Sequence, residues 1–228
     1  MIGIIGAMEI EVNALKGRLS NARKEKISGI EFVLGTLYEK EVVVAACGVG
    51  KVFAAVAAES MILKYNPEII VNSGVAGALS KELGIADIVV ATDVVQHDMN
   101  TTPLGDPPGF LSGINKVFIP CSKKASMLLC KASQALGISP LEGRIASGDL
   151  FVSTIKQKRN VAEKFSAVAC EMEGASIGHV CYVNNVDFAV IRSISDSLSD
   201  DSHMEYPEFL KIAAENSIKI MDKFIELY

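Results

Sequence analysis

The chain has 228 residues, 50% of them hydrophobic, and a formal net charge of -5 at pH 7. This length and hydrophobic content suffice for one sizeable core, and no Pro-, Gly- or Ser-rich linker divides the chain, so we expect a single domain over residues 1–228. The acidic balance and the scattered Lys and Arg argue against nucleic acid as a partner, because a phosphate backbone needs clustered positive charge. A small-molecule partner is favoured instead.

The N-terminus is apolar but lacks the basic region and the cleavage site of a signal peptide, and no run reaches the ~18 apolar residues of a membrane span. We therefore expect a cytoplasmic protein without a membrane partner. The cysteines are odd in number and none forms a Cys-x-x-Cys pair, while the three histidines lie far apart, so we expect reduced core thiols and no metal site.

Short apolar runs and apolar residues at helical spacing alternate along the chain. We expect strands at 2–6, 27–37, 42–47, 69–72, 88–95, 145–148, 165–170 and 186–192. We expect helices at 9–19, 51–65, 122–136, 175–183 and 206–227. In the closing helix, one face should carry Phe209, Ile212, Ala213, Ile220 and Phe224. This order predicts an α/β fold with a mixed central β-sheet flanked by helices.

Two connections stand out. The polar residues 38–41 between two β-rich runs predict a hairpin turn. Residues 98–115 are rich in Pro and Gly and show little periodicity, which predicts a long excursion of the kind that often serves function or an interface.

Two glycine motifs do not fit the nucleotide sites that they resemble. Gly48-Val49-Gly50-Lys51 lacks the first glycine of a phosphate loop, and Val52 stands where that loop has a hydroxyl residue. The glycines of residues 3–6 lack the middle glycine of a dinucleotide fingerprint. We therefore expect no nicotinamide cofactor.

Carboxylates follow two of the predicted strands, with Glu171 and Glu173 after one and Asp196 after another. Parallel strands bring their carboxyl ends to one edge of a sheet, so Glu173 and Asp196 should face one cleft. Acids are also favoured at helix N-termini, and for Glu171 this alternative is equally well supported. Glycine-marked strand ends at Gly6, 74–77 and Gly148, together with Glu11, complete the outline of a pocket.

Six segments carry a family resemblance: 6–11 (GAMEIE), 48–51 (GVGK), 72–77 (NSGVAG), 147–151 (SGDLF), 171–173 (EME) and 192–196 (RSISD). In this order they resemble the motifs of 5'-methylthioadenosine/S-adenosylhomocysteine nucleosidases. That family has a nucleoside phosphorylase-like fold and cleaves an adenine N-glycosidic bond with water as the nucleophile. The resemblance therefore implies a hydrolase with no cofactor.

For the water and the sugar, the resemblance implies that Glu11 deprotonates the attacking water and that Arg192 helps to hold it. It implies that Glu173 accepts hydrogen bonds from the ribose hydroxyls and that Met172 packs against the sugar. The resemblance also assigns Met8 to substrate binding.

For the base, the resemblance makes Asp196 the general acid, with Phe151 stacked on adenine, the backbone of Val152 reading its edge and Gly77 close to it. Cleavage of this bond leaves negative charge on the purine and positive charge on the ribose, so an acid at the purine and carboxylates at the sugar are chemically sensible. Stacking is favoured for Phe151, although an aromatic residue between Leu150 and Val152 is also plausible core.

Two positions depart from the family. Val75 stands where some relatives have a serine near the water, and Leu104 stands where relatives can have an aromatic residue. The excursion aligns with the family's segment that reaches the partner of a homodimer, so we expect a homodimer. Nothing in the excursion is obviously placed to select one 5' substituent, so we expect the site to accept several of them. Candidate substrates are methylthioadenosine, S-adenosylhomocysteine, 5'-deoxyadenosine and 6-amino-6-deoxyfutalosine, an intermediate of menaquinone synthesis. A phosphorylase and a nucleoside-binding sensor are the alternatives.

Overall fold

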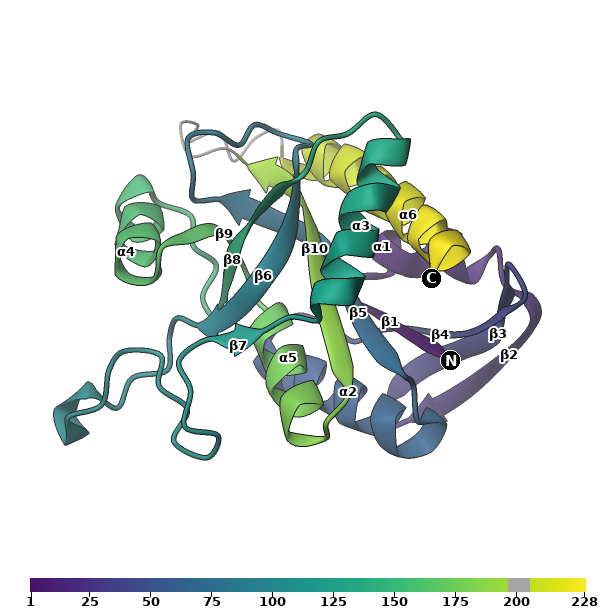
Figure 1. Ribbon diagram of the computed structural model, residues 1–228, viewed down its shortest axis with the longest axis horizontal. Coiled ribbons are helices and arrows are strands. Elements are labelled where there is room, and N and C mark those ends of the chain that lie inside the picture. The colour runs from purple at the N-terminus through teal and green to yellow at the C-terminus, as the bar shows by residue number, and fades with distance from the viewer. Residues whose placement is uncertain (197–205) are drawn as a thin grey trace.

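The computed structural model describes residues 1–196 and 206–228, with the side chains of all of these except 206–211. Its centre is a ten-stranded mixed β-sheet in the order β10-β6-β8-β9-β5-β1-β4-β3-β2, with β7 paired to β6. Strand β10 also pairs with β5, so β5, β9, β8, β6 and β10 close on themselves. Helices cover both faces of the sheet (Figure 1).

The strands are β1 (Ile2–Gly6), β2 (Ser20–Ile27), β3 (Ile30–Leu37), β4 (Lys40–Ala46), β5 (Ile69–Ala78), β6 (Ile88–Gln96), β7 (Ile119–Pro120), β8 (Leu141–Ser147), β9 (Ala167–Glu171) and β10 (Asp187–Asp196). The helices are α1 (Glu9–Lys16), α2 (Lys51–Tyr65), the short 3-10 helix η1 (Thr102–Leu104), α3 (Lys123–Ala135), α4 (Ile155–Phe165), α5 (Gly174–Val183) and α6 (Tyr206–Leu227). The predicted α/β class with a mixed central sheet is confirmed.

The core lies on both faces of the sheet. Buried residues of α2 and α5 pack on one face, and those of α1, α3 and α6 pack on the other. Helix α4 closes a third, smaller cluster through Val161 and Phe165, at the end of the closed strands. Ala213, Ile220 and Phe224 of α6 are buried as expected, but Ile212 is exposed, and the side chain of Phe209 lies outside the described residues.

In the N-terminal third, the observed bounds of the strands and of helix α1 differ from the expected ones. The predicted strand 27–37 is β3 extended too far at its start, because Ser28 and Gly29 have φ values of 51° and 84° and form a tight turn between β2 and β3. Strand β2 escaped prediction because it is polar and largely exposed. Helix α1 ends at Lys16 rather than at residue 19. The hairpin turn at 38–41 is confirmed, with Tyr38 and Glu39 both at positive φ.

Strand β5 is longer than predicted. It continues through the glycine-rich stretch to Ala78, because each residue of that stretch pairs with β10 in the register Ser193 to Val75 and Asp196 to Gly77. The glycines that were expected to end the strand therefore lie within it, next to the acidic residues of the neighbouring elements.

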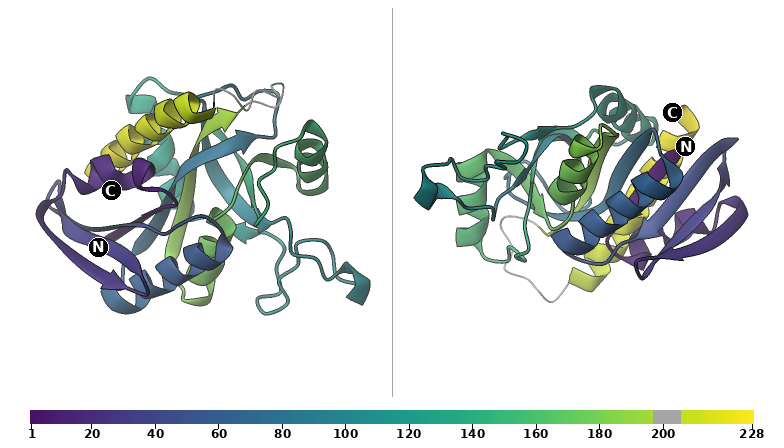
Figure 2. Two further views of the ribbon diagram at one scale, coloured as in Figure 1. Left: turned by 180° about the vertical axis from the view of Figure 1, so that it is seen from behind. Right: turned by 90° about the horizontal axis from the view of Figure 1, so that it is seen from below.

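The excursion between β6 and β7 projects away from the body of the molecule in all views (Figures 1 and 2). It carries η1, and the side chain of Leu104 at the end of η1 is 82% exposed.

The cysteines are all unpaired, and Cys47, Cys121, Cys170 and Cys181 are buried. Burial raises the pKa of Cys47, Cys170 and Cys181 to about 12 and that of the half-buried Cys130 to about 11. No helix among the residues that the structure describes is long and apolar enough to cross a membrane.

Candidate active site

A cavity of about 160 Å³ lies where the carboxyl ends of β1, β5, β9 and β10 meet the loop after β8. All but one of the predicted site residues line it: Met8, Glu11, Gly77, Phe151, Val152, Met172, Glu173 and Asp196. The exception is Arg192. The expectation that Glu173 and Asp196 face one cleft is confirmed.

Glu11 is fixed by backbone amides. The amides of Ala7 and Met8 each donate to Oε2 at 2.8 Å, and the amide of Val75 donates to Oε1 at 3.1 Å. The residue is only 4% exposed, and burial raises its pKa above the usual carboxyl value although these amides oppose the shift. A β-carbon at Gly74 would lie 2.6 Å from Oε1, so glycine is what lets the carboxylate approach β5. The result is an oriented carboxylate with increased proton affinity.

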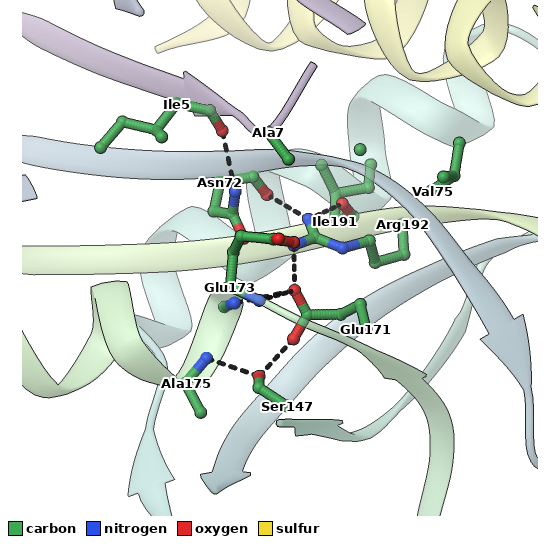
Figure 3. Close-up of polar contacts among 12 residues, drawn as sticks. Ile5, Ala7, Asn72, Val75, Ser147, Glu171, Glu173, Ala175, Ile191 and Arg192 are labelled. Atoms are coloured by element: carbon green, nitrogen blue, oxygen red, sulfur yellow. Dashed lines mark hydrogen bonds and ion pairs between the residues drawn. The ribbon is translucent and has the colours of Figure 1, made fainter. Parts of the chain in front are cut away.

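Arg192 is not among the residues that line the cavity and is 1% exposed. Figure 3 shows its polar contacts. Its Nη1 donates to the carbonyls of Asn72 and Ile191, and its Nη2 donates to the side chains of Asn72 and Glu171. These contacts make Arg192 a link between Asn72 within β5 and the carboxyl end of β9. Sequence reasoning placed it on the water, and none of these contacts tests that role.

Glu171 and Glu173 differ although they are two residues apart. The Glu171 carboxylate accepts hydrogen bonds from Arg192, from Ser147 and from the amides of Glu173 and Gly174 at the start of α5. Although burial opposes the shift, these contacts hold its pKa below the usual value. The helix-start alternative therefore applies to Glu171.

Glu173 points into the cavity and accepts a hydrogen bond at Oε1 from the amide of Gly50 at 2.8 Å. Burial, followed by repulsion from the ionised Glu171, raises its pKa to about 7. The Gly48–Lys51 motif thus supports a carboxylate rather than a phosphate.

Asp196 ends β10 beside Gly77. Its Oδ1 accepts a hydrogen bond from the Ser195 hydroxyl at 3.2 Å, and its Oδ2 pairs with Lys158 Nζ at 2.5 Å. Both carboxylate oxygens would lie 3.1 Å from a β-carbon at Gly77. The Asp196 side chain remains 30% exposed, so it is partly open to a ligand.

Comparisons with known proteins identify the family to which the chain belongs. The family model of the phosphorylase superfamily matches residues 1–226. A 5'-methylthioadenosine/S-adenosylhomocysteine nucleosidase from Shewanella halifaxensis is 41% identical over 218 residues, which cover 95% of this chain and 94% of that protein. The chain belongs to this nucleosidase family. It is therefore an N-glycosyl hydrolase, and the resemblance to this family is confirmed.

Solved structures of the family cover the whole chain. The nucleosidase of Neisseria meningitidis, solved with methylthio-immucillin-A, matches with a TM-score of 0.95 at 30% identity over 100% of this chain and 99% of that one. The futalosine hydrolase of Helicobacter pylori matches with a TM-score of 0.94 at 35% identity over 100% of this chain and 97% of that one. The expected nucleoside phosphorylase-like fold is confirmed.

Within the nucleosidase fold, Phe151 is exposed and lines the cavity, so the interpretation of Phe151 as core is wrong. Sequence reasoning missed further lining residues, among them Val49, Leu150 and Ser195. Each lies inside a motif that was recognised, but it was not assigned to the site because its residue type suggests no specific role. It also missed Lys158, which reaches the site from a helix that was not predicted.

Proposed function

We propose that the protein hydrolyses the N-glycosidic bond of 5'-methylthioadenosine and S-adenosylhomocysteine, releasing adenine and the corresponding ribose, and that residues 1–228 form one nucleosidase domain. One observation carries the proposal. Glu11 and Asp196, which come from α1 and β10, line the same cavity with Glu173 and Phe151. A base and an acid on one cavity suit a reaction that adds water to one side of a bond and a proton to the other.

Glu11 is the general base in this proposal. Its raised pKa suits a group that takes a proton from water, and its three backbone donors hold the carboxylate in place for this step. Arg192 lies close to Glu11 and helps to hold this part of the site in place. It fixes Glu171 and Asn72 and leaves its buried Nε without a partner among the described residues, which suits the proposed contact with the water.

Asp196 is the general acid that protonates the departing adenine. Phe151 stacks on the purine, since an exposed ring at the cavity wall offers a face to any base. The backbone of Val152 reads the purine edge, and Gly77, which has no side chain, leaves the Asp196 carboxyl free to face it.

Glu173 binds the ribose hydroxyls, with Met172 and Met8 against the sugar and its substituent. All three residues line the cavity. Glu173 accepts hydrogen bonds from hydroxyls best as the carboxylate, and that charge also stabilises the cationic ribose of the transition state.

A phosphorylase of the same superfamily is the alternative reaction. Among the described residues that line the cavity there are four carboxylates, Glu11, Glu171, Glu173 and Asp196, and no Lys, Arg or His. Such a wall repels phosphate and accepts neutral water. A nucleoside sensor would have no use for both a base and an acid.

Adenine release from methylthioadenosine, measured with and without phosphate, tests the proposal. We expect equal rates and free methylthioribose as the second product. A phosphate-dependent rate and a ribose 1-phosphate product would contradict hydrolysis, and tight binding without turnover would identify a sensor.

Cleavage of 6-amino-6-deoxyfutalosine is a second candidate activity, because the Helicobacter pylori futalosine hydrolase matches the whole chain. We expect strict selection at the base and tolerance at the 5' end, so 5'-deoxyadenosine should also be cleaved. Losing a methylene contact costs only ~1–3 kcal/mol, whereas an unpaired polar group at the base costs far more. Cleavage of methylthioinosine as fast as methylthioadenosine would contradict this.

We also propose a cytoplasmic homodimer. The excursion extends from the body and exposes Leu104, and Val52 and Phe53 of α2 expose further apolar surface. Burial of these side chains against a second copy would remove apolar area from water. A fully active monomer in sedimentation at micromolar concentration would contradict the dimer.

A further inference from the structure

Lys158 of α4 is a lysine in an unusual place. It is 2% exposed, and its Nζ lies 2.5 Å from Asp196 Oδ2. Lysine is rarely buried so completely unless it is paired. Among the described residues, no other ion pair reaches Asp196.

The sequence of α4 fixes this position. Thr154 caps the helix with Gln157 in a capping box, and the Lys158 amide donates to the Thr154 carbonyl at 2.9 Å. Lys158 follows the helical spacing of Val161 and Phe165, which pack in the core, so an apolar residue would be expected here. A buried ion pair is weak support for stability, because apolar residues of similar volume often serve as well or better. The charge therefore calls for another explanation.

The ion pair has a direct consequence for the chemistry of the site. The ion pair joins the Asp196 carboxylate to the Lys158 ammonium group. A carboxylate has no proton to give to a departing purine. The cation that touches it holds one.

We propose that Lys158 is a positioning residue that acts through Asp196, holding its carboxylate beside the base and resupplying the proton that Asp196 passes to the purine. This inference rests on the proposed function. As the C1'–N9 bond breaks and its electron pair moves onto the purine, an Nζ–H bond breaks and an O–H bond forms on Asp196. The carboxyl then gives a proton to the purine nitrogen. Lys158 is left as a neutral amine. After the product departs, it takes a proton from the solvent, to which Glu11 returns the proton that it took from the attacking water.

The test uses two substrates and four variants, one of which, Asp196→Asn, serves as the reference for loss of the acid. Methylthioadenosine needs a proton on its leaving group, whereas the 5-methylthioriboside of 4-nitrophenol releases a stable anion and needs none. Lys158→Met removes the proton donor, and Lys158→Arg keeps a positive charge that cannot be deprotonated. Lys156→Met is the matched control, because Lys156 is exposed on the same helix.

On methylthioadenosine we expect kcat to fall about 100-fold in Lys158→Met, the scale of general acid catalysis, and to stay at least about 10-fold low in Lys158→Arg. On the nitrophenyl substrate both variants should stay within about threefold of the wild type, because protonation is not needed there. Lys156→Met should match the wild type on both substrates.

Three results would overturn the inference. The first is wild-type kcat on methylthioadenosine in Lys158→Arg, because charge alone would then suffice. The second is an equal loss on both substrates in both Lys158 variants, which is the mark of a structural role. The third is full activity in Lys158→Met alongside an impaired Asp196→Asn, which leaves the proposed function intact. If the wild-type protein released no adenine, that result would instead contradict the proposed function, and this inference with it.

Discussion

The two ends of the cavity hold their carboxylates in different ways. Glu11 is 4% exposed and receives three hydrogen bonds from backbone amides, whereas Asp196 is held by the side chains of Lys158 and Ser195 and is 30% exposed on its side chain. Backbone amides hold the carboxylate that accepts their hydrogen bonds in one position and favour its charged form. A side-chain substitution does not remove these donors. Side-chain partners can move and can give up a proton. The comparison teaches that the Glu11 end is preorganised and the Asp196 end is adjustable.

The largest effect is expected at the fixed end. Glu11→Gln removes the proton acceptor but keeps the shape of the side chain, so turnover of methylthioadenosine should fall about 10³-fold while the affinity for an uncleavable analogue stays within a few fold. Kinetics of adenine release and calorimetric binding measure the two quantities. Glu9→Gln, on the exposed side of the same helix, is the control. Near-normal turnover in Glu11→Gln would remove Glu11 as the base.

At the adjustable end, Asp196→Asn keeps a hydrogen-bonding group but has no transferable proton. We expect a loss of about 10²-fold in kcat on methylthioadenosine and a much smaller loss on the 4-nitrophenyl substrate. Equal losses on both substrates would mean that Asp196 only positions the base.

A matched pair of glycine substitutions compares the two ends directly. Gly74→Ala would place a β-carbon 2.6 Å from the fixed Glu11 Oε1, and Gly77→Ala would place one 3.1 Å from both oxygens of Asp196. Glu11 cannot shift without losing its amides, so Gly74→Ala should lower kcat by about 10-fold or more, whereas Gly77→Ala should mainly raise KM. Equal effects on kcat would show that both ends are fixed alike.

The smallest effect concerns Glu173, which lies between the two ends. The pKa of Glu173 is about 7 in the folded protein and 4.5 in the unfolded chain. Between these two pH values the carboxyl group is therefore protonated in the folded protein and ionised in the unfolded chain. The folded state then binds more protons than the unfolded state, and the stability contributed by protonated Glu173 falls as the pH rises from about 4.5 to about 7. Glu173→Gln should therefore stabilise the protein by about 1–3 kcal/mol at pH 8 and by little at pH 4.

Glu171→Gln is the matched control for that measurement. It leaves Arg192 buried without its carboxylate, which should destabilise the protein by about 3 kcal/mol or more at pH 8. Denaturant unfolding at both pH values measures these changes. Destabilisation by Glu173→Gln at pH 8 would contradict the raised pKa.

Strong patterns made much of the fold predictable. The buried runs of β1, β6 and β10 and the helical spacing of α2 and α5 were recognised because burial on the sheet leaves few polar residues in them. Strand β2 was missed because it is exposed at the edge, and only its pairing with β3 makes it a strand. Element type follows local sequence where the core imposes a pattern, and it follows tertiary contacts where it does not.

The site residues were likewise predictable where a strong local sequence pattern surrounds them. Glu173 and Asp196 could be brought together from strand order alone, because acids at the ends of buried strands are conspicuous. Lys158 could not, since its helix is mostly polar and was not recognised, although the Thr154 and Gln157 capping box marks its start. Arg192 was found, but its contacts lie behind the cavity wall, and residue type alone does not say which way a side chain points.

The unreactive thiols of this chain have a practical consequence. A thiol must lose its proton to react with maleimides or iodoacetamide, and the native cysteines, mostly buried and with raised pKa values, should label slowly near neutral pH. A cysteine introduced at the exposed Leu104 should therefore react first without prior removal of the native ones. A fluorophore attached there would report on the excursion, and a change in its emission on dilution would follow the separation of two copies.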